Sequence, residues 1–282
     1  MGRCLNGWRK RQILHFLNML QIQETLQASD LQSTSMEGSR KHLRKGGIWS
    51  IIYTFHNFFL DPTLLSYSTS MHLQSLQSYD ILLSDTSDGS FFLDNRLPVF
   101  RDWIVPDQVH GTRILTITDR KDITPESLSQ TDGIISNLRG QIFGVKLADC
   151  NGIIILWKEW YAVLHAGWRG LAGGIIGQAF RKLEESGEST HECQVFCSPS
   201  IRACCYEVGE SFREHFPEDC FNQEEERIHL DMIAYIQKIL QSNHIPLENI
   251  HIDSRCTCCD HKYYSYRRDK TSQRMVFGVR KK

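Results

Sequence analysis

The amino-acid sequence predicts a single α/β (α+β) domain with a mixed β-sheet core and flanking helices. From about residue 78 onward, short runs dominated by Val, Ile, Tyr and Phe alternate with turns bounded by Gly, Asp or Asn, which is typical of β-strands. Two later segments carry apolar residues at helical spacing. The 282 residues are 41% hydrophobic, which is enough for a sizeable core, and the chain has no internal repeat. This mixture favours one sheet-based domain.

The expected strands follow one another with polar connections between them. Their strongly apolar character indicates that most are buried. In chain order they are YDILLS (79–84), RILTIT (113–118), DGIIS (132–136), IFGVKLA (142–148), GIIILW (152–157), YAVLHA (161–166), IHID (250–253) and RMVFGVR (274–280).

Two helices are expected among these strands. The first covers 170–187, where one face carries Leu171, Ile175, Ile176, Ala179 and Leu183. The second covers 230–243, where one face carries Met232, Ile233, Ile236, Ile239 and Leu240. Asp231 is a suitable N-cap for the second helix.

The first 70 residues differ in composition from the rest. They are rich in Gln, Ser, Leu and Lys, include the basic polar stretch 35–47, and show one helical pattern near 9–27. We expect residues 1–70 to form an extension and residues 71–282 to form the folded domain. Met36 and Met71 are alternative start positions, so the extension is expected to be either disordered or untranslated.

Charge and cysteine usage narrow the class of protein. The 32 basic and 33 acidic residues nearly cancel, so no overall field favours nucleic acid or an anionic membrane. The most apolar early run, 47–60, is interrupted by polar residues and is too short to span a bilayer. The ten cysteines lack the spacing of a small secreted disulfide framework. We therefore expect a cytoplasmic protein with reduced thiols that acts on a small molecule.

Three soft or borderline metal ligands lie at the ends of expected strands. Cys150 follows the strand at 142–148, His165 lies near the end of 161–166, and His110 precedes 113–118. One thiolate and two imidazoles suit zinc, and three protein ligands leave a fourth position open, as a catalytic site requires. Two alternatives stay open. The three residues can be ordinary structural residues, or Cys150 and His165 can form a nucleophilic pair without metal.

The segment HAGWRG (165–170) has the features of an anion site. Gly167 and Gly170 relax the backbone between a strand and a helix, where helix N-terminal amides stabilise negative charge. Arg169 adds a guanidinium fork suited to phosphate or carboxylate. The alternative is a strand-to-helix turn in which Arg169 pairs with a neighbouring acid.

Two further clusters can each serve structure or function. The segments CTCCDH (256–261) and HECQVFC (191–197), with Cys204 and Cys205, form either a second metal site or buried free thiols. The segment YYSYRRD (263–269) offers tyrosines for stacking on a base, with Arg267 and Arg268 for an anion. The alternative for YYSYRRD is a solvated strand with salt-bridged arginines.

Taken together, these motifs resemble one known family. The segments QVHG (108–111), TDGIIS (131–136), ADC (148–150), HAGWRG, SPSIRACCYEVG (198–209), CT (256–257) and YYSYRRD are similar to those of the multicopper polyphenol oxidase, or laccase-domain (YfiH-type), family. The order and approximate spacing agree over about 170 residues. The resemblance implies one domain similar in architecture to the deamidase domain of cytotoxic necrotising factor. It also implies Zn²⁺ held by His110, Cys150 and His165, with copper suggested only by the family name.

The resemblance further implies a zinc-dependent purine nucleoside phosphorylase with adenosine deaminase side activity. The expected reaction converts adenosine, inosine, guanosine or S-methyl-5′-thioadenosine, with phosphate, into the free base and ribose-1-phosphate. The partners are therefore a purine nucleoside and phosphate, with no nucleic acid and no membrane, in a monomer or homodimer. The candidate catalytic residues are Arg169 and Asp149. The candidate phosphate ligands are Arg169, Gly170, Arg267 and Arg268.

Two other functions remain as alternatives, since the match to the family is incomplete. Relatives described as peptidoglycan-editing factors suggest an amide hydrolase acting on a muramyl-serine nucleotide precursor. The altered N-terminal motifs suggest a degenerate, non-catalytic metal-binding protein, because only SDTSDGSFFLDNRLP (84–98) stands where the family has glycine-rich and Ser-x-Asn-Leu segments. The ADC motif also lacks the Pro that usually follows it, and TSQRM (271–275) replaces T-G-R, so Arg274 is not carried over as a site residue.

Overall fold

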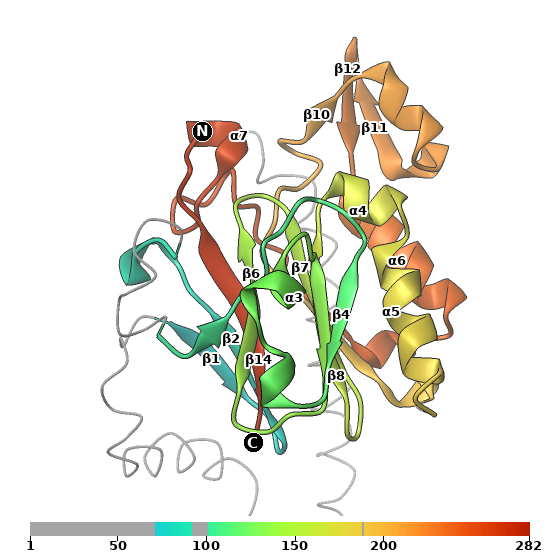
Figure 1. The fold of residues 1–282 in the computed structure, drawn as a ribbon. Helices are drawn as coiled ribbons and strands as arrows, with labels where there is room; N and C mark the ends of the chain where they lie inside the picture. The colour runs from blue at the N-terminus through green and yellow to red at the C-terminus, as the bar shows by residue number, and fades with distance from the viewer. Residues whose placement is uncertain (1–70, 92–100, 188) are drawn as a thin grey trace, which may run out of the picture. The chain divides into compact units, whose positions relative to one another are not determined.

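The computed structural model describes residues 71–91, 101–187 and 189–282. The expected N-terminal extension, with its helical pattern near 9–27, lies outside the described residues, as does the part of the 84–98 segment from 92 onward. All the strands and helices predicted from residue 78 onward fall inside them (Figure 1).

Strands from distant parts of the chain form two large mixed sheets and one small sheet. The five-stranded sheet has the order β1 (His72–Ser75), β2 (Tyr79–Leu83), β14 (Met275–Lys281), β6 (Ile142–Leu147) and β3 (Trp103–Ile104). The six-stranded sheet has the order β13 (Ile250–Ile252), β9 (Gln194–Cys197), β7 (Asn151–Leu156), β8 (Tyr161–Ala166), β5 (Gly133–Ser136) and β4 (Ile114–Ile117). The small sheet has the order β10 (Glu207–Val208), β12 (Arg227–Leu230) and β11 (Phe221–Glu224).

Parallel and antiparallel pairs occur in both large sheets, as the α/β prediction requires. In the five-stranded sheet only β3 and β6 are parallel. In the six-stranded sheet β13 pairs with β9 and β4 pairs with β5 in parallel, while the inner strands are antiparallel. The predicted mixed α/β class is confirmed, but the strands are divided between two packed sheets, because the strongly apolar inner strands need cover on both faces.

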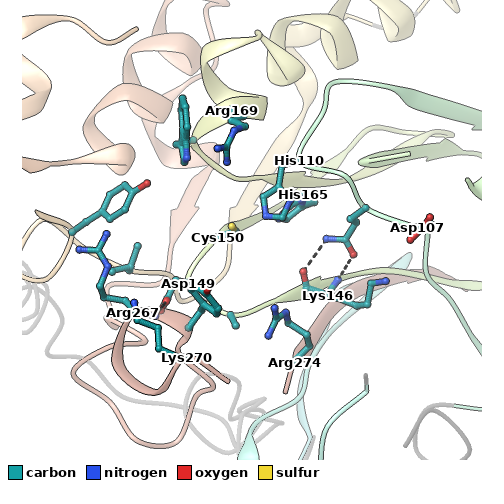
Figure 2. Close-up of a pocket in the computed structure, with 16 residues that line it drawn as sticks. Asp107, His110, Lys146, Asp149, Cys150, His165, Arg169, Arg267, Lys270 and Arg274 are labelled. Carbon is teal, nitrogen blue, oxygen red and sulfur yellow. Dashed lines mark hydrogen bonds between the residues drawn. The ribbon is translucent and has the colours of Figure 1, made fainter. Parts of the chain in front are cut away.

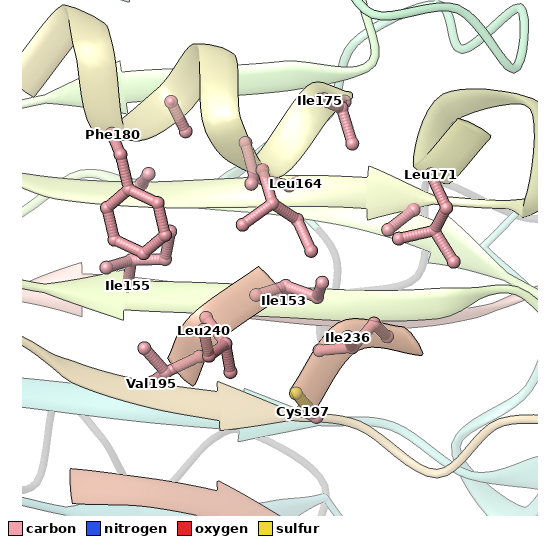
Figure 3. Close-up of a cluster of buried hydrophobic side chains, with 14 of the residues drawn as sticks. Ile153, Ile155, Leu164, Leu171, Ile175, Phe180, Val195, Cys197, Ile236 and Leu240 are labelled. Atoms are coloured by element: carbon pink, nitrogen blue, oxygen red, sulfur yellow. The ribbon is translucent and has the colours of Figure 1, made fainter. Parts of the chain in front are cut away.

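The six-stranded sheet is the middle layer of the domain. Its outer face packs against α5 (Ile175–Glu184) and α6 (Met232–Ser242), where Leu164, Phe180 and Ile236 are fully or almost fully buried (Figure 3). Its inner face packs against the five-stranded sheet through a second buried cluster that includes Val163 and Phe277. In Figure 1, α5 and α6 accordingly lie on one side of the strands, and β1, β2 and β14 lie on the other.

Strand β7 shows how the sequence produces these layers. Because side chains alternate across a strand, Ile153 and Ile155 face the helices while Ile154 and Leu156 face the other sheet. All six residues of β7 are buried. A continuous apolar run, rather than alternation of polar and apolar residues, is therefore what this central position demands.

The helices agree with the predictions except at one position. Helix α6 begins after Asp231, whose Oδ1 accepts hydrogen bonds from the amides of Ile233 and Ala234, each at 3.0 Å, so the predicted N-cap is confirmed. The predicted helix over 170–187 is instead two helices, α4 (Trp168–Ala172) and α5. The break falls at Gly174, whose φ of 80° lies in the left-handed region and cannot continue a helix.

Two shorter helices complete the regular structure. Helix α3 (Pro125–Leu128) follows β4, and α7 (Tyr266–Asp269) precedes β14. No helix in the described part of the chain combines the length and apolar character needed to cross a membrane.

The interface between the six-stranded sheet and the helices predicts a clear stability effect. Leu164→Ala should lower the free energy of unfolding by about 2–5 kcal/mol, because it removes buried methyl groups and leaves a cavity between β8 and α5. Urea unfolding followed by circular dichroism measures the change. Leu247→Ala, at a side chain that is 66% exposed, is the matched control and should change stability by no more than about 0.5 kcal/mol. Equal effects of both substitutions would contradict this assignment of the core.

Candidate functional site

The structure brings the three predicted metal ligands together. Cys150 lies in the short connection between β6 and β7, His165 lies on β8 beside it, and His110 lies in the loop before β4. One ligand atom from each residue lies within 4.8 Å of the others. The imidazole rings of His110 and His165 meet edge to face with their centroids 4.8 Å apart, and both point toward Cys150 (Figure 2).

A buried carboxylate, that of Asp132, organises two of the three ligands. Its Oδ1 accepts a hydrogen bond from the His110 amide at 2.9 Å and lies 2.7 Å from Nδ1 of His165. Its Oδ2 accepts from the amides of Val109 and Gly111, at 3.2 and 2.7 Å. The side chain of Asp132 is completely inaccessible to solvent. With Nδ1 of His165 held by a carboxylate, Nε2 is the nitrogen left to face a ligand.

The electrostatics of the site favour charged forms of all three buried groups. Burial opposes ionisation of Asp132, but hydrogen bonds from His165 and the Gly111 amide prevail and lower the pKa of the carboxyl. Burial likewise opposes a thiolate at Cys150, yet the charge of His165 and a hydrogen bond from His110 lower its pKa to about 6. Burial disfavours the His165 imidazolium, whereas Cys150 and Asp132 raise its pKa to about 9. Cys150 is therefore prepared as a thiolate beside a protonated His165, a pair suited to nucleophilic attack, and a metal ion would bind the thiolate and displace the proton from His165.

The space around the trio fits a metal ion. A Cβ atom added to Gly167 would lie 3.1 Å from Sγ of Cys150 and 3.3 Å from Cδ2 of His110, so a glycine keeps this position open. One thiolate and two imidazoles form a donor set typical of catalytic zinc sites, with a fourth position for substrate or water.

The trio lies in a cavity of about 580 Å³, within the usual range for small-molecule sites. Five basic residues and three large aromatic residues contribute to its wall, with two carboxylates. The lining residues are Asp107, Gln108, His110, Lys146, Ala148, Asp149, Cys150, His165, Trp168, Arg169, Ile201, Tyr206, Tyr266, Arg267, Lys270 and Arg274. An anionic or phosphorylated ligand with a flat apolar part matches such a wall.

Asp149 lines the cavity but already uses both carboxylate oxygens. Oδ1 accepts from the Thr257 hydroxyl at 2.7 Å, and Oδ2 accepts from the Arg267 amide at 2.6 Å. Its φ of 87° is a strained backbone conformation for a residue other than glycine, of the kind found at functional sites. The contacts made by Asp149 position two neighbouring loops. Its assignment as a catalytic group stays a prediction.

The two arginines of YYSYRRD have different environments. Arg267 lines the cavity, and its Nη1 donates to the carbonyl of Glu207 at 2.9 Å. Arg268 is not among the lining residues. Its guanidinium donates to the carbonyls of Thr257 and Tyr263, at 2.8 and 2.9 Å, and pairs with Asp269. This guanidinium thus holds the preceding loop together, and the assignment of Arg268 to the phosphate site stays a prediction. The strand interpretation of YYSYRRD was wrong, since its last four residues form α7.

Arg169 and Gly170 share a helix but not an environment. The Arg169 side chain is exposed at the cavity wall, with its guanidinium carbon 4.3 Å from the ring centroid of Trp168, and it forms no ion pair with any described residue. Gly170 is buried in α4 and does not line the cavity. Helix α4 has only five residues, so the expected contribution of its dipole and N-terminal amides to anion binding is small.

Several site residues were not predicted from the sequence. Asp132 was included only as part of TDGIIS, and its role is visible only when the loop at 109–111 is seen to wrap around it. Gln108 and Lys146 join the β6 end of the cavity, where the Gln108 amide bonds to the Lys146 carbonyl and amide at 2.9 and 2.7 Å (Figure 2). Arg274 was set aside because its motif is altered, yet the structure places it in the cavity wall. Lys146, Lys270 and Arg274 lie far apart in the sequence, and no local pattern identifies them as neighbours in one cavity.

The sequence of this chain is similar to those of several known proteins. The model of the multi-copper polyphenol oxidoreductase laccase family matches residues 92–281. A protein of Aquifex aeolicus (strain VF5) named purine nucleoside phosphorylase is 37% identical over 193 residues, which cover 66% of this chain and 89% of that protein. A protein of an unknown prokaryotic organism named adenosine deaminase RL5 is 30% identical over 183 residues, covering 59% of this chain and 70% of that protein.

The fold is also shared with a solved structure. The crystal structure of the Bacillus licheniformis hypothetical protein YfiH superposes with a TM-score of 0.67 at 21% identity, covering 76% of this chain and 97% of that chain. The predicted resemblance is thus confirmed by the family match and by the shared fold. The chain belongs to the multi-copper polyphenol oxidoreductase laccase family of YfiH-like proteins.

Proposed function

We propose that this protein is a zinc-dependent purine nucleoside phosphorylase with adenosine deaminase as a second activity. The observation that carries the proposal is the meeting of a Cys-His-His donor trio with five basic residues in one cavity. The relative named purine nucleoside phosphorylase, which this chain matches over 89% of its length, supports the choice of substrate.

Phosphorolysis requires an anion site beside the sugar. Phosphate attacks C1′, the bond from C1′ to the base nitrogen breaks, and a C1′–O bond to phosphate replaces it. The cavity offers Lys146, Arg169, Arg267, Lys270 and Arg274 as cationic groups. In Figure 2, Arg169 lies on the opposite side of Cys150 from Arg267 and Lys270, so basic side chains surround the centre of the cavity. We place phosphate beside Arg169, whose exposed guanidinium lies in the cavity wall next to the Trp168 ring.

The purine requires a flat apolar surface and a proton as it leaves. Trp168, Tyr206 and Tyr266 line the cavity and offer rings for stacking. Burial, and then the nearby Cys150 charge, raise the pKa of the Tyr206 hydroxyl. Tyr206 therefore stays protonated at neutral pH and is the hydroxyl donor that we assign to the departing base.

Zinc is the metal that the donor set favours. A zinc ion held by His110, Cys150 and His165 would supply Lewis-acid polarisation next to the bound substrate. Two His and one Cys also occur in blue-copper sites, but those add a distant axial ligand that is usually Met. No methionine is among the described residues that line the cavity. The protein's own contribution is the carboxylate of Asp132. It holds the His110 loop in place and contacts Nδ1 of His165, so that Nε2 of His165 faces the ion.

Deamination of adenosine is favoured as the second activity by the same geometry. An open fourth position at the trio would suit a water molecule, the nucleophile that deamination needs to replace the amino group of the purine ring and release it as ammonia. The relative named adenosine deaminase RL5 is 30% identical and supports this assignment.

The decisive test is turnover of defined nucleosides by protein of known zinc content. Adenosine, inosine and S-methyl-5′-thioadenosine are incubated with and without phosphate, and free base and sugar phosphate are measured by mass spectrometry. We expect phosphate-dependent release of the base and of the corresponding sugar 1-phosphate, which is ribose-1-phosphate from adenosine or inosine and 5-methylthioribose-1-phosphate from S-methyl-5′-thioadenosine. We also expect inosine from adenosine without phosphate. Cys150→Ala should abolish both reactions and reduce bound zinc. No turnover by zinc-loaded protein would reject the proposal and make a muramyl-serine nucleotide the next substrate.

The contact between Asp132 and His165 predicts a loss of metal affinity. Asp132→Asn should weaken zinc binding by about 10- to 100-fold, because an amide lacks the negative charge that orients His165 and presents an NH₂ group toward the loop amides. Competition with a chelator of known affinity measures the change. Asp119→Asn, at a half-exposed surface carboxylate, should leave zinc affinity unchanged. Unaltered affinity in Asp132→Asn would remove the carboxylate from the metal centre.

The exposed position of Arg169 predicts a selective effect on phosphate. Arg169→Ala should raise the phosphate KM by roughly tenfold or more, since a charge-assisted hydrogen bond contributes about 1.5–3 kcal/mol. Zinc content should stay at the wild-type value. Arg181→Ala, on the exposed face of α5, is the control and should leave the phosphate KM unchanged. A normal phosphate KM in Arg169→Ala would move the anion site to the other basic residues.

A further inference from the structure

A second group of thiols lies outside the cavity, where two loops meet. Cys204 and Cys205 follow β9, and Cys256 and Cys259 follow β13. These two strands are parallel neighbours, so the loops after them emerge at the same edge of the sheet. The sulfur atoms of the four residues all lie within 4.8 Å of one another.

The spacing of the sulfurs matches a tetrahedral metal site. The sulfur of Cys259 lies 3.7 Å from that of Cys204 and 3.3 Å from that of Cys205, and Cys204 and Cys205 are 3.7 Å apart. A tetrahedron with Zn–S bonds of about 2.3 Å has sulfurs about 3.8 Å apart. The three separations are close to this value, and the sulfur of Cys256 lies within 4.8 Å of each of the other three, so the four thiols are near enough to share one ion.

The backbone of the second loop has the form of a zinc knuckle. Cys256 and Cys259 are separated by two residues, as in a C-x-x-C motif. The motif is hard to recognise in the sequence because one of the two intervening residues, Cys258, is also a cysteine. The carbonyl of Cys256 accepts from the amides of Cys259 and Asp260, at 3.2 and 2.9 Å, and this closes the turn. The turn directs both sulfurs toward the loop that holds Cys204.

A buried guanidinium lies beside the four thiols. The guanidinium of Arg202 is mostly buried near Cys256, and its Nε and Nη1 have no hydrogen-bond partner in the described part of the chain. A divalent ion with four thiolates carries two negative charges, and a buried guanidinium beside it would offset part of them.

Two other cysteines of the domain are buried in the apolar core and lie apart from this group. Cys193 and Cys197 lie in the apolar core, and burial raises the pKa of each thiol to about 12. The expected role of buried free thiols thus applies to these two residues, which do not join the 204/205/256/259 group. That group contains exposed members, Cys204 and Cys259, so an ion can reach it from solvent.

We propose that Cys204, Cys205, Cys256 and Cys259 bind a structural zinc ion. Its role is to tie the loop after β9 to the loop after β13. Both loops support the cavity wall, because the Cys205 carbonyl accepts from Arg267 at 3.4 Å and the Thr257 hydroxyl donates to Asp149 at 2.7 Å. This site does not depend on which reaction the cavity catalyses.

The test measures the number of zinc ions bound per chain in full-length protein in which Cys150→Ala has removed one ligand of the cavity trio. Cys150→Ala protein is purified under reducing conditions, loaded with zinc, desalted and analysed by inductively coupled plasma mass spectrometry. We expect one tightly bound zinc per chain. Adding Cys259→Ser should remove it, whereas adding Cys258→Ser should retain it, because Cys258 is not part of the group.

Cobalt binding by Cys150→Ala protein supplies a readout that does not depend on whether the added Cys258→Ser and Cys259→Ser substitutions allow folding. Cys150→Ala protein loaded with Co²⁺ should show the strong thiolate-to-metal absorption and intense ligand-field bands of a tetrahedral four-thiolate site. A weak octahedral spectrum would overturn the proposal. A thiol titration gives a second way to overturn it. If unreduced, metal-free protein shows two fewer free thiols than reduced protein, the group forms a disulfide and not a metal site. Loss of zinc equally in the Cys258→Ser and Cys259→Ser variants would also reject the assignment.

Discussion

The buried carboxylate of Asp132 is the constraint on which the candidate metal site depends. An ionised carboxylate with no solvent exposure is costly unless its oxygens are satisfied. Asp132 meets this requirement by accepting three backbone amides from the His110 loop and contacting Nδ1 of His165. The energetic need of the carboxylate and the geometric need of the metal ligands are thus met by the same hydrogen bonds. Removing the charge would release a loop and a side chain together.

The sheet places Cys150 where those two histidines meet. Strands β7 and β8 pair so that Gly152 lies opposite His165, which puts Cys150 just beyond the paired region. The connection from β6 to β7 is only three residues long and passes through Asp149 in a left-handed conformation. The thiol therefore projects into the cavity from a rigid position between the two large sheets, not from a mobile surface loop.

The sequence was most informative where chemistry and periodicity are local. Strands such as β7 and the capped start of α6 follow from apolar runs and from Asp231, and the predicted ligands His110, Cys150 and His165 do come together. The break between α4 and α5 was missed because paired glycines are compatible with either a helix or a turn. The division into two sheets, the role of Asp132 and the cavity position of Arg274 depend on contacts between distant segments, for which no pattern in one sequence exists. The contacts of Arg268 could not be predicted for the same reason, since its partners are carbonyls of a folded loop.

The anchoring of Arg267 has a consequence for ligand affinity. Its Nη1 donates to the carbonyls of Cys205 and Glu207, and its guanidinium lies 5.2 Å from the ring centroid of Tyr206. An arginine on an open surface loses rotamer freedom when it captures an anion, at about 0.5–1.5 kcal/mol for such a side chain. Here folding has already restricted that freedom. Arg267 would therefore offer its charge to an anion in the cavity with little further loss of conformational entropy, and part of the thermodynamic cost of recognition would be met before any ligand arrives.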